Sequence, residues 1–392
     1  MQEQDTQILF AGWSESVLFC QQPHLKLFRH GTVPGWNSID SVDFKHLNAV
    51  TCGFGDHNGL LGVVSTSPSG LWTTTPNRES LVSHGANGDE DSPRLKYVAI
   101  AGNGKTAVTF VQAPSAMLTH ISEFSSFDDF VQWYDRPADS YPTAHYMLHG
   151  RAKQLIANET SFTLLTETGE VYTWGDARHR SLGRTPTAHM PAEKPGVVDA
   201  LGGLKIGKIV SGGWMGAALA EGGSLYLWGT TTPGTADAIN ALPSGDEEVA
   251  LVDIPASLGM HGEEADDFEV LDVGVGDGHI VAVGSFPTPP RPPHDPAGDN
   301  PSAYSFETSS ETPSATALAS PALHVSRTHI YAIGDGRNGQ LGLGVPSYAE
   351  NWKQAPVPWS WREHKAVGVA CGPRTSFAFI RPTLNKKRKR TI

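Results

Sequence analysis

Short runs of alternating apolar and polar residues, separated by glycine-containing turns, recur along most of the chain. Between Leu155 and Gly183 the sequence reads LIANETSFTLLTETGEVYTWGDARHRSLG, in which two runs of β-favouring residues flank a tight turn at Thr168–Gly169. The segment from Lys208 to Gly229 repeats this order, with a turn at Gly222–Gly223 and the same Tyr-x-Trp-Gly ending. The pattern predicts pairs of short antiparallel strands.

The two segments match each other at one fixed offset. Three residues recur 54 positions later without a gap: Gly169 and Gly223, Tyr172 and Tyr226, Trp174 and Trp228. Self-similarity at a fixed offset is the signature of a repeat architecture, so it indicates the fold before any single motif does.

Four further units resemble this pair. They cover Leu47 to Thr75, Leu95 to Ile121, a stretch that starts at Phe268 and resumes at His329, and Lys365 to Ile380. The small residue that ends the first strand of each unit marks the spacing: Gly53, Gly102, Asn158, Gly212, Gly276 and Gly372. The steps are 49, 56, 54, 64 and 96 residues, and the last becomes 96 − 42 = 54 once the insertion at 285–326 is removed. A period near 54 with about four short strands is typical of one blade of a β-propeller.

The two chain ends are expected to close the ring. The unit Lys365 to Ile380 lacks an outgoing strand, and the strand-like Ile8 to Trp13 lacks incoming ones. Pairing them in one blade predicts that Phe10 lies beside Phe377 to Ile380. The expected fold is therefore an all-β propeller over residues 1–384 with six recognised units, and with a seventh blade if Val17 to Leu47 is a degraded repeat.

Composition excludes several other classes of protein. The 392 residues include 42 Gly and 28 Pro, which follow no strict period, so a collagen-like fold is excluded. The N-terminal MQEQDTQ lacks the basic and apolar regions of a secretory signal, and no apolar run approaches the ~20 residues that span a bilayer. We therefore expect a protein without a membrane role.

The charge is unevenly distributed. The formal net charge is −12, yet residues 209–290 contain 13 acidic residues and no Lys or Arg, which leaves −12 + 13 = +1 for the rest. This acidic sector disfavours nucleic acid and favours a basic partner, so the propeller is not expected to bind DNA directly. A solvated acidic loop that keeps the protein soluble is the alternative interpretation.

Two segments differ in composition from the repeats. Residues 285–326 are rich in Pro, Ser and Thr, and we expect a disordered insertion there. Residues 385–392 form a basic tail, in which the consecutive charges are Lys386, Lys387, Arg388, Lys389 and Arg390. Such a run is typical of a nuclear-import signal or a nucleic-acid-touching arm, with a solvated charge run as the alternative. The expected location is therefore the nucleus and the cytoplasm.

No pattern of catalytic or metal-binding residues stands out. The 16 His are scattered, the three Cys have no metal-type spacing, and the chain contains no Gly-x-Ser-x-Gly, His-Glu-x-x-His or phosphate-loop motif. The loops GDARHRSLG (175–183) and GDGRNGQLG (334–342) do not lead into a helical pattern, so they are predicted to be structural. We expect no enzyme activity, cofactor or metal.

Loop residues that the repeat does not require are candidates for contacting a partner. Arg and Trp contribute most to the energy of protein interfaces, and binding residues on a rigid ring lie in its loops. The candidates are Arg178, His179, Arg180, Trp214, Arg337, Asn338 and Arg374. Each of them also has a structural interpretation, as a packed or solvated loop residue.

The repeat resembles a known family. The stretches VYTWGDARHRSLG and IYAIGDGRNGQLGLG are similar to the repeat of the regulator-of-chromosome-condensation propellers. The family's Cys-Gly-x-x-His-Ser strand survives in part, since Gly276–His279 keeps the His and Cys371–Gly372 keeps the Cys-Gly. The resemblance covers Leu155 to Gly229 and His329 to Ile380.

The resemblance implies a protein-binding platform. It is closest to divergent single-domain members and to fungal tubulin-suppressor-like, Elongator–diphthamide accessory relatives. Those relatives imply an adaptor for a small zinc-binding protein that serves tRNA wobble-uridine and diphthamide modification. The alternative implied by the wider family is a nucleotide exchange factor or a chromatin-associated regulator of a small GTPase.

Overall fold

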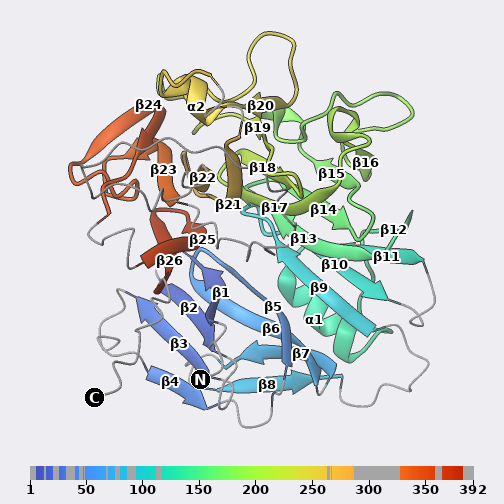
Figure 1. Cartoon of the computed structure of the whole chain (residues 1–392). Coiled ribbons are helices and arrows are strands. Elements are labelled where there is room, and N and C mark those ends of the chain that lie inside the picture. Colours follow the sequence, from blue (N-terminus) through green and yellow to red (C-terminus); the bar gives the residue numbers. More distant parts are fainter. Residues whose placement is uncertain are drawn as a thin grey trace, which may run out of the picture.

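Antiparallel sheets make up most of the regular secondary structure in the described part of the chain. The structure is a computed structural model that describes residues 6–12, 15–20, 26–31, 40–43, 47, 49–67, 69–75, 80–85, 94–111, 117–262, 265, 267–286, 327–357 and 364–382. Within these residues the strands form seven sheets, six of four strands and one of two. Figure 1 shows them arranged around a common centre, with β5–β8 at the bottom, β9–β12 on the right and β21–β24 at the upper left. The predicted all-β propeller is confirmed.

The sheets are numbered 1 to 7 in chain order, and in each of them successive strands pair with one another. Sheet 1 contains β1 (Thr6–Ala11), β2 (Glu15–Cys20), β3 (Lys26–Gly31) and β4 (Asp40–Asp43). Sheet 2 contains β5 (Ala49–Asp56), β6 (Gly59–Ser67), β7 (Ser69–Thr74) and β8 (Leu81–His84). Sheet 3 contains β9 (Arg94–Ile100), β10 (Thr106–Val111), β11 (Leu118–Phe124) and β12 (Ala144–His149).

The second half of the ring keeps the repeat most clearly. Sheet 4 contains β13 (Ala152–Ala157), β14 (Ser161–Thr166), β15 (Val171–Gly175) and β16 (Gly196–Val197). Sheet 5 contains β17 (Ile206–Gly212), β18 (Met215–Ala220), β19 (Leu225–Gly229) and β20 (Ala250–Val252). Sheet 6 contains β21 (Glu269–Val275), β22 (His279–Phe286), β23 (Arg327–Gly336) and β24 (Ser347–Gln354), and sheet 7 contains β25 (His364–Gly372) and β26 (Thr375–Pro382).

The first strands of the sheets form a closed inner ring. Each contacts the first strand of the next sheet, in the order β1, β5, β9, β13, β17, β21 and β25, and β25 in turn contacts β1. At this junction Gly372 lies against Ala11, because a Cβ at position 372 would come within 3.3 Å of the Ala11 Cβ. The ring therefore closes by packing between the first and the last sheet.

The predicted pairing of the chain ends in one blade is wrong. Phe10 pairs with Val17 of β2, and Phe379 pairs with Gly368 of β25. The reason is that residues 15–43 supply three strands, β2 to β4, so the N-terminal strand has partners of its own. The region from Val17 to Leu47, for which a seventh blade remained open, thus contains strands of sheet 1.

Large aromatic residues pack between neighbouring sheets, as the recurring Trp-Gly suggests. Trp174 and Trp228 are both fully buried. The Trp228 ring lies on the loop of the preceding sheet, where a Cβ at Gly183 would come within 2.9 Å of its Cγ. The Trp228 Nε1–H donates a hydrogen bond to the Ser181 carbonyl oxygen at 3.2 Å. Gly183 also has φ +59°, so glycine is favoured there by both space and backbone conformation.

The described residues contain few helical elements, and the sequence pattern predicts none of them. α1 (Phe127–Asp135) lies in the connection between β11 and β12, which the strand pattern left unassigned. Ser126 caps it by accepting a hydrogen bond from the Asp129 N–H at 3.1 Å, and Phe130 packs on Phe124 with ring centroids 5.4 Å apart. The other helical pieces are short: α2 (Ile254–Ser257), η1 (Arg178–Arg180) and η2 (Asp199–Leu201).

The first two residues of the predicted insertion belong to a strand. Ser285 and Phe286 belong to β22, where they pair with Thr328 and Arg327 of β23. Residues 287–326 lie outside the described residues, as does the basic tail 385–392.

Candidate functional site

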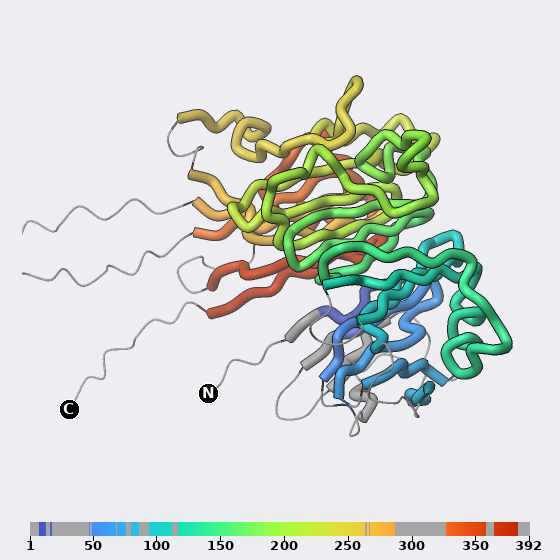
Figure 2. Tube along the Cα trace, turned by 90° about the vertical axis from the view of Figure 1, so that its right-hand side faces the viewer, coloured from blue at the N-terminus to red at the C-terminus, as the bar shows by residue number. Residues whose placement is uncertain are grey.

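One end of the ring gathers two kinds of connection. In each antiparallel meander the turn between the first two strands and the loop between the last two emerge at the same end, which we call the loop face. α1 lies there too, on the right in Figure 2, whereas the ends of β22 and β23 that lead to the insertion point to the left. All seven predicted partner-binding residues lie on the loop face: Arg178, His179, Arg180, Trp214, Arg337, Asn338 and Arg374.

A cavity of about 660 Å³ opens at the ring axis on the loop face. We call it the axis cavity, because residues at the ends of β1, β5, β9, β13, β17, β21 and β25, or in the turns that follow, line it. Among the described residues that line it there is no Lys or Arg, and the ionisable side chains are Asp56, His57, Asp128, Glu159, Asp277 and Cys371. The cavity is therefore acidic.

Backbone hydrogen bonds between neighbouring turns hold the main chain at two of these acidic residues. The Glu159 N–H donates to the Gly213 carbonyl at 3.0 Å, and the Glu159 carbonyl accepts from the Asn103 N–H at 2.8 Å. The Asp277 N–H donates to the Pro373 carbonyl at 3.0 Å. The turns of adjacent sheets are thus hydrogen-bonded to one another through the main chain of Glu159 and Asp277.

The pKa of the Glu159 carboxyl is raised. Burial is the largest cause, the charge of Asp277 adds to it, and His57 partly offsets it. A cation brought to this point would favour the charged carboxylate. The axis cavity is accordingly suited to a Lys or Arg side chain, and poorly suited to a phosphate or another anion.

A second hollow of about 310 Å³, the rim pocket, adjoins the axis cavity, and Asp277 lines both. Arg337, Asn338 and Arg374 line the rim pocket together. Both Arg337 Nη atoms donate to Asp237, at 2.8 and 2.7 Å, and its guanidinium lies 5.3 Å from the centre of the Tyr348 ring. Burial raises the pKa of Tyr348 to about 12, so its hydroxyl remains protonated and able to hydrogen-bond. The pocket can therefore contact both charged and polar groups of a ligand.

The third predicted cluster has a mixed role. His179 packs its ring edge against Trp214, with centroids 4.7 Å apart, and Arg178 pairs with Asp176 at 2.5 Å while 73% of its side chain is exposed. Arg180 instead donates to the carbonyl oxygens of Pro243 and Gly245, at 2.8 and 2.6 Å, and so joins the loops of sheets 4 and 5. The structural interpretation therefore fits Arg180, whereas Arg178, His179 and Trp214 are presented on the surface.

Sequence reasoning missed the acidic residues at the centre. Glu159 and Asp277 each follow directly the small residue that marks a repeat, Asn158 and Gly276. Comparing the residue after each marker would have singled them out, because the other repeats do not require a carboxylate there. Of the rim-pocket residues, Asp237 lies in the loop between β19 and β20 and Tyr348 lies in β24; neither segment follows the repeat, so no signal pointed to them.

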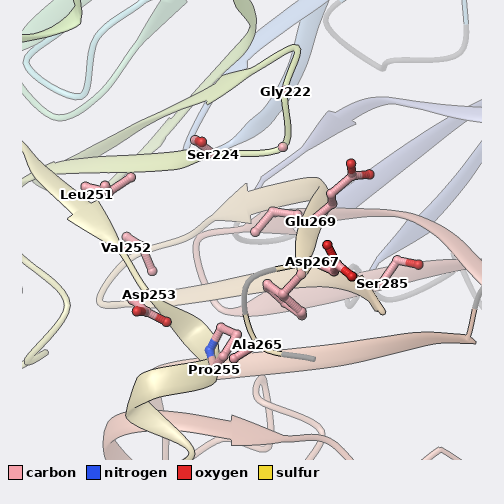
Figure 3. Close-up of a pocket in the computed structure, with 13 residues that line it drawn as sticks. Gly222, Ser224, Leu251, Val252, Asp253, Pro255, Ala265, Asp267, Glu269 and Ser285 are labelled. Carbon is pink, nitrogen blue, oxygen red and sulfur yellow. The ribbon is translucent and has the colours of Figure 1, made fainter. Parts of the chain in front are cut away.

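A hollow of about 720 Å³ lies at the opposite end of the ring, within the acidic sector. Figure 3 shows its lining, where Gly222 and Ser224 come from the β18–β19 hairpin, Leu251 to Asp253 from β20 and the residue after it, and Ser285 from the end of β22. Asp253, Asp267 and Glu269 are its carboxylates. The Asp253 carboxylate caps α2 by accepting from the Ala256 N–H at 2.8 Å, so part of this charge has a structural partner.

In the part of the chain that the structure describes, no group of three or more His, Cys, Asp or Glu could hold a metal ion, and no helix is long and apolar enough to cross a membrane. The buried His279 forms a hydrogen bond with the Ser376 hydroxyl, in which Nε2 and Oγ lie 3.1 Å apart. This bond connects sheets 6 and 7. The basic tail Lys386–Arg390 lies outside the described residues.

Comparison with known sequences identifies the repeat. Residues 329–379 match the model of the regulator of chromosome condensation (RCC1) repeat. RCC1 domain-containing protein 1 of Mus musculus is 28% identical over 239 residues, which cover 58% of this chain and 55% of the relative. The chain thus matches about half of the length of that relative. RCC1 domain-containing protein RUG3, mitochondrial, of Arabidopsis thaliana is 29% identical over 133 residues, 34% of this chain and 28% of the relative.

Solved structures with a similar arrangement include human WBSCR16, with a TM-score of 0.46, 13% identity, and coverage of 96% of this chain and 73% of that one. Yeast RCC1 (Prp20), crystallised with Kap60, has a TM-score of 0.39, 13% identity, and coverage of 96% and 80%. The chain is thus a β-propeller that contains a match to the RCC1 repeat at residues 329–379 and is similar in sequence to RCC1 domain-containing proteins.

Proposed function

We propose that the protein is a non-catalytic binding platform whose loop face takes a protein partner, with a Lys or Arg of that partner in the axis cavity. The observation that carries this proposal is the juxtaposition of Glu159 and Asp277 at the centre of a rim of surface Trp, Arg and Tyr residues. An acidic centre attracts a basic residue, and the aromatic and guanidinium groups around it are the types that dominate interface energy.

Rigid placement supports the proposal as well. The turns carrying the two carboxylates are hydrogen-bonded to their neighbours, so little conformational freedom is lost when a partner binds. The exposed cluster of Arg178, His179 and Trp214 and the rim pocket with Arg337, Asn338 and Arg374 would supply the surrounding contacts.

For the identity of the partner we propose a small zinc-binding protein, with the chain acting as its adaptor in tRNA wobble-uridine and diphthamide modification. This finer proposal rests on the sequence resemblance alone. A small GTPase, for which the chain would act as exchange factor or chromatin-associated regulator, is the alternative partner. The acidic sector 209–290 supplies Asp237 and Asp277 to the loop face, where it would favour a basic partner, and the tail Lys386–Arg390 would direct the protein to the nucleus as well as the cytoplasm.

Quantitative affinity purification of the tagged protein and two variants tests the proposal. The first variant combines Glu159→Gln with Asp277→Asn, and the matched control combines Asp267→Asn with Glu269→Gln at the opposite end. Partners that bind the loop face should be lost from the first variant and retained by the control. Equal recovery from all three proteins would contradict the assignment to the loop face.

Nucleotide release separates the two kinds of partner. An adaptor leaves the rate of nucleotide release from purified small GTPases unchanged at micromolar concentration. If the protein accelerates nucleotide release and the Glu159→Gln, Asp277→Asn variant does not, the protein is an exchange factor that acts through the loop face and not an adaptor.

A further inference from the structure

Sheet 7 differs from the other six in its outer edge. In sheets 1 to 6 the second strand pairs with a third, as β18 pairs with β19. Among the described residues β26, the second strand of sheet 7, pairs with β25 alone. A strand edge without a neighbour presents a row of backbone donors and acceptors to any extended segment that fits.

A pocket lies where the side chains of that third strand would pack. It measures about 370 Å³ and lies between sheets 6 and 7, and we call it the seam pocket. The loop Gly339–Gly342 of sheet 6 lines one side, and Ser376, Phe377 and Ala378 of β26 line the other.

The seam between sheets 4 and 5 shows what fills the equivalent place. The loops Gly175–Gly183 and Gly334–Gly342 share the pattern Gly-Asp-x-Arg-x-x-x-Leu-Gly, so Gly183 corresponds to Gly342. Trp228 of the third strand of sheet 5 lies on Gly183, whereas no described residue comes within 4 Å of the place that a Cβ at Gly342 would occupy. Both glycines have a positive φ, +59° and +65°, so the two loops share the same local backbone.

Strand register gives the corresponding position on β26. Trp228 pairs with Gly216, which follows the first residue of β18. The β25–β26 hairpin joins Gly372 to Thr375 as the β17–β18 hairpin joins Gly212 to Met215, so Ser376 corresponds to Gly216. Ser376 lines the seam pocket, opposite the loop that would receive an indole.

The Trp-Gly pair that fills the seam between sheets 4 and 5 is not present a third time in this sequence. The pair Trp-Gly occurs only twice in the full sequence, at Trp174–Gly175 and Trp228–Gly229. Both belong to third strands already paired in sheets 4 and 5.

We propose that the edge of β26 is a docking site for an extended segment of a protein partner, which adds a third strand to sheet 7 and places an aromatic side chain, preferably the Trp of a Trp-Gly pair, in the seam pocket. Main-chain hydrogen bonds to β26 supply affinity, and the pocket supplies specificity. The site is separate from the acidic centre of the axis cavity, so this proposal does not depend on the function proposed above.

The probe is a fluorescent synthetic peptide with the sequence of Ser224–Thr230, SLYLWGT, which is the third strand of sheet 5. Fluorescence polarisation should show saturable binding to the full chain. A peptide with Ala in place of its Trp should bind at least about tenfold more weakly, because a buried Trp is a typical hot spot.

Two substitutions in the protein separate edge pairing from general damage. Ala378→Pro removes a backbone donor from β26 and should weaken binding at least about tenfold, whereas Ala378→Ser keeps the donor and should bind as the unchanged protein does. Hydrogen exchange gives a second measurement, in which the peptide should slow exchange in β26 of the unchanged protein. Binding by the Glu159→Gln, Asp277→Asn variant should be unaffected.

Three results would overturn the proposal. The first is absence of peptide binding, and the second is equal binding of the Trp and Ala peptides. The third is that β26 of the free protein is strongly protected from hydrogen exchange and the peptide does not bind. The last result would mean that another segment of this chain occupies the edge.

Discussion

The seam between sheets 4 and 5 and the seam between sheets 6 and 7 are built from the same loop, yet only the first is filled by the residues that the structure describes. In the first, Trp228 lies on Gly183 and hydrogen-bonds to Ser181. In the second, the corresponding Gly342 faces the seam pocket. The comparison teaches that the Gly-Asp-x-Arg-x-x-x-Leu-Gly loop is one half of a joint, and that the Trp-Gly strand of the following sheet is the other half.

The same comparison separates structure from function among the repeated residues. Residues that recur between repeats form the joints, as Trp228 and Gly183 do. Residues that break the recurrence, such as Glu159 and Asp277, line the axis cavity. In this propeller the residues that join neighbouring sheets therefore recur from repeat to repeat, whereas the residues in the turns at the axis differ.

Removing the Trp from the filled seam should have the largest effect. Trp228→Ala deletes a fully buried indole, and the change should lower the free energy of unfolding by about 3–5 kcal/mol. Urea unfolding followed by circular dichroism measures this loss. Trp214→Ala, in a loop where the side chain is half-buried, is the matched control and should cost far less. Similar losses for the two variants would show that the seam is not a stabilising joint.

Adding one methyl group to each loop sharpens the comparison. Gly183→Ala and Gly342→Ala impose a similar backbone strain, because both residues have positive φ. Only Gly183→Ala also pushes a Cβ to within 2.9 Å of the Trp228 ring, and such overpacking typically costs about 1–3 kcal/mol more. The difference between the two unfolding free energies therefore reports whether each seam is filled. Equal losses would mean that the space beside Gly342 is occupied in solution.

Acid should weaken the junction of sheets 6 and 7. His279 is fully buried, and burial lowers its pKa despite the opposing effects of Asp277 and Asp335. In the unfolded chain the same imidazole takes up its proton near pH 6.5, so the unfolded state binds more protons and stability falls as the pH drops below that value.

The variant His279→Gln should show a flatter dependence of unfolding free energy on pH between 8 and 5. His145 and His329 also have lowered pKa values through burial, and they contribute an equal background to both proteins. If the unfolding free energies of the two proteins change with pH in parallel, His279 does not cause the loss of stability in acid.

The sequence predicted what depends on recurrence. The strands around Thr168–Gly169 and Gly222–Gly223 form as the alternation indicates, because each sheet buries residues such as Leu164, Ala217 and Trp174 against its neighbours. The loop-face location of the seven predicted binding residues also follows from their positions between strands of a meander.

The sequence did not predict what depends on contacts between distant segments. The partners of β1 could not be found because the strands of sheet 1 carry a weak form of the repeat. The last unit lacked an outgoing strand, so pairing Phe10 with β26 accounted for the repeat pattern equally well. The role of Arg180 was hidden because its acceptors, Pro243 and Gly245, are backbone carbonyls more than 60 residues away. Burial of Glu159 likewise arises only once neighbouring turns meet at the axis.

The most direct test of the loop face as the binding surface is site-specific photo-crosslinking in cells. A benzoylphenylalanine placed at Trp214 reports on the loop face, and one placed at Leu251, which is 64% exposed at the opposite end, is the control. We predict partner adducts from position 214 that disappear when Glu159→Gln and Asp277→Asn are added, and none from position 251. Adducts from position 251 without any from position 214 would contradict the account.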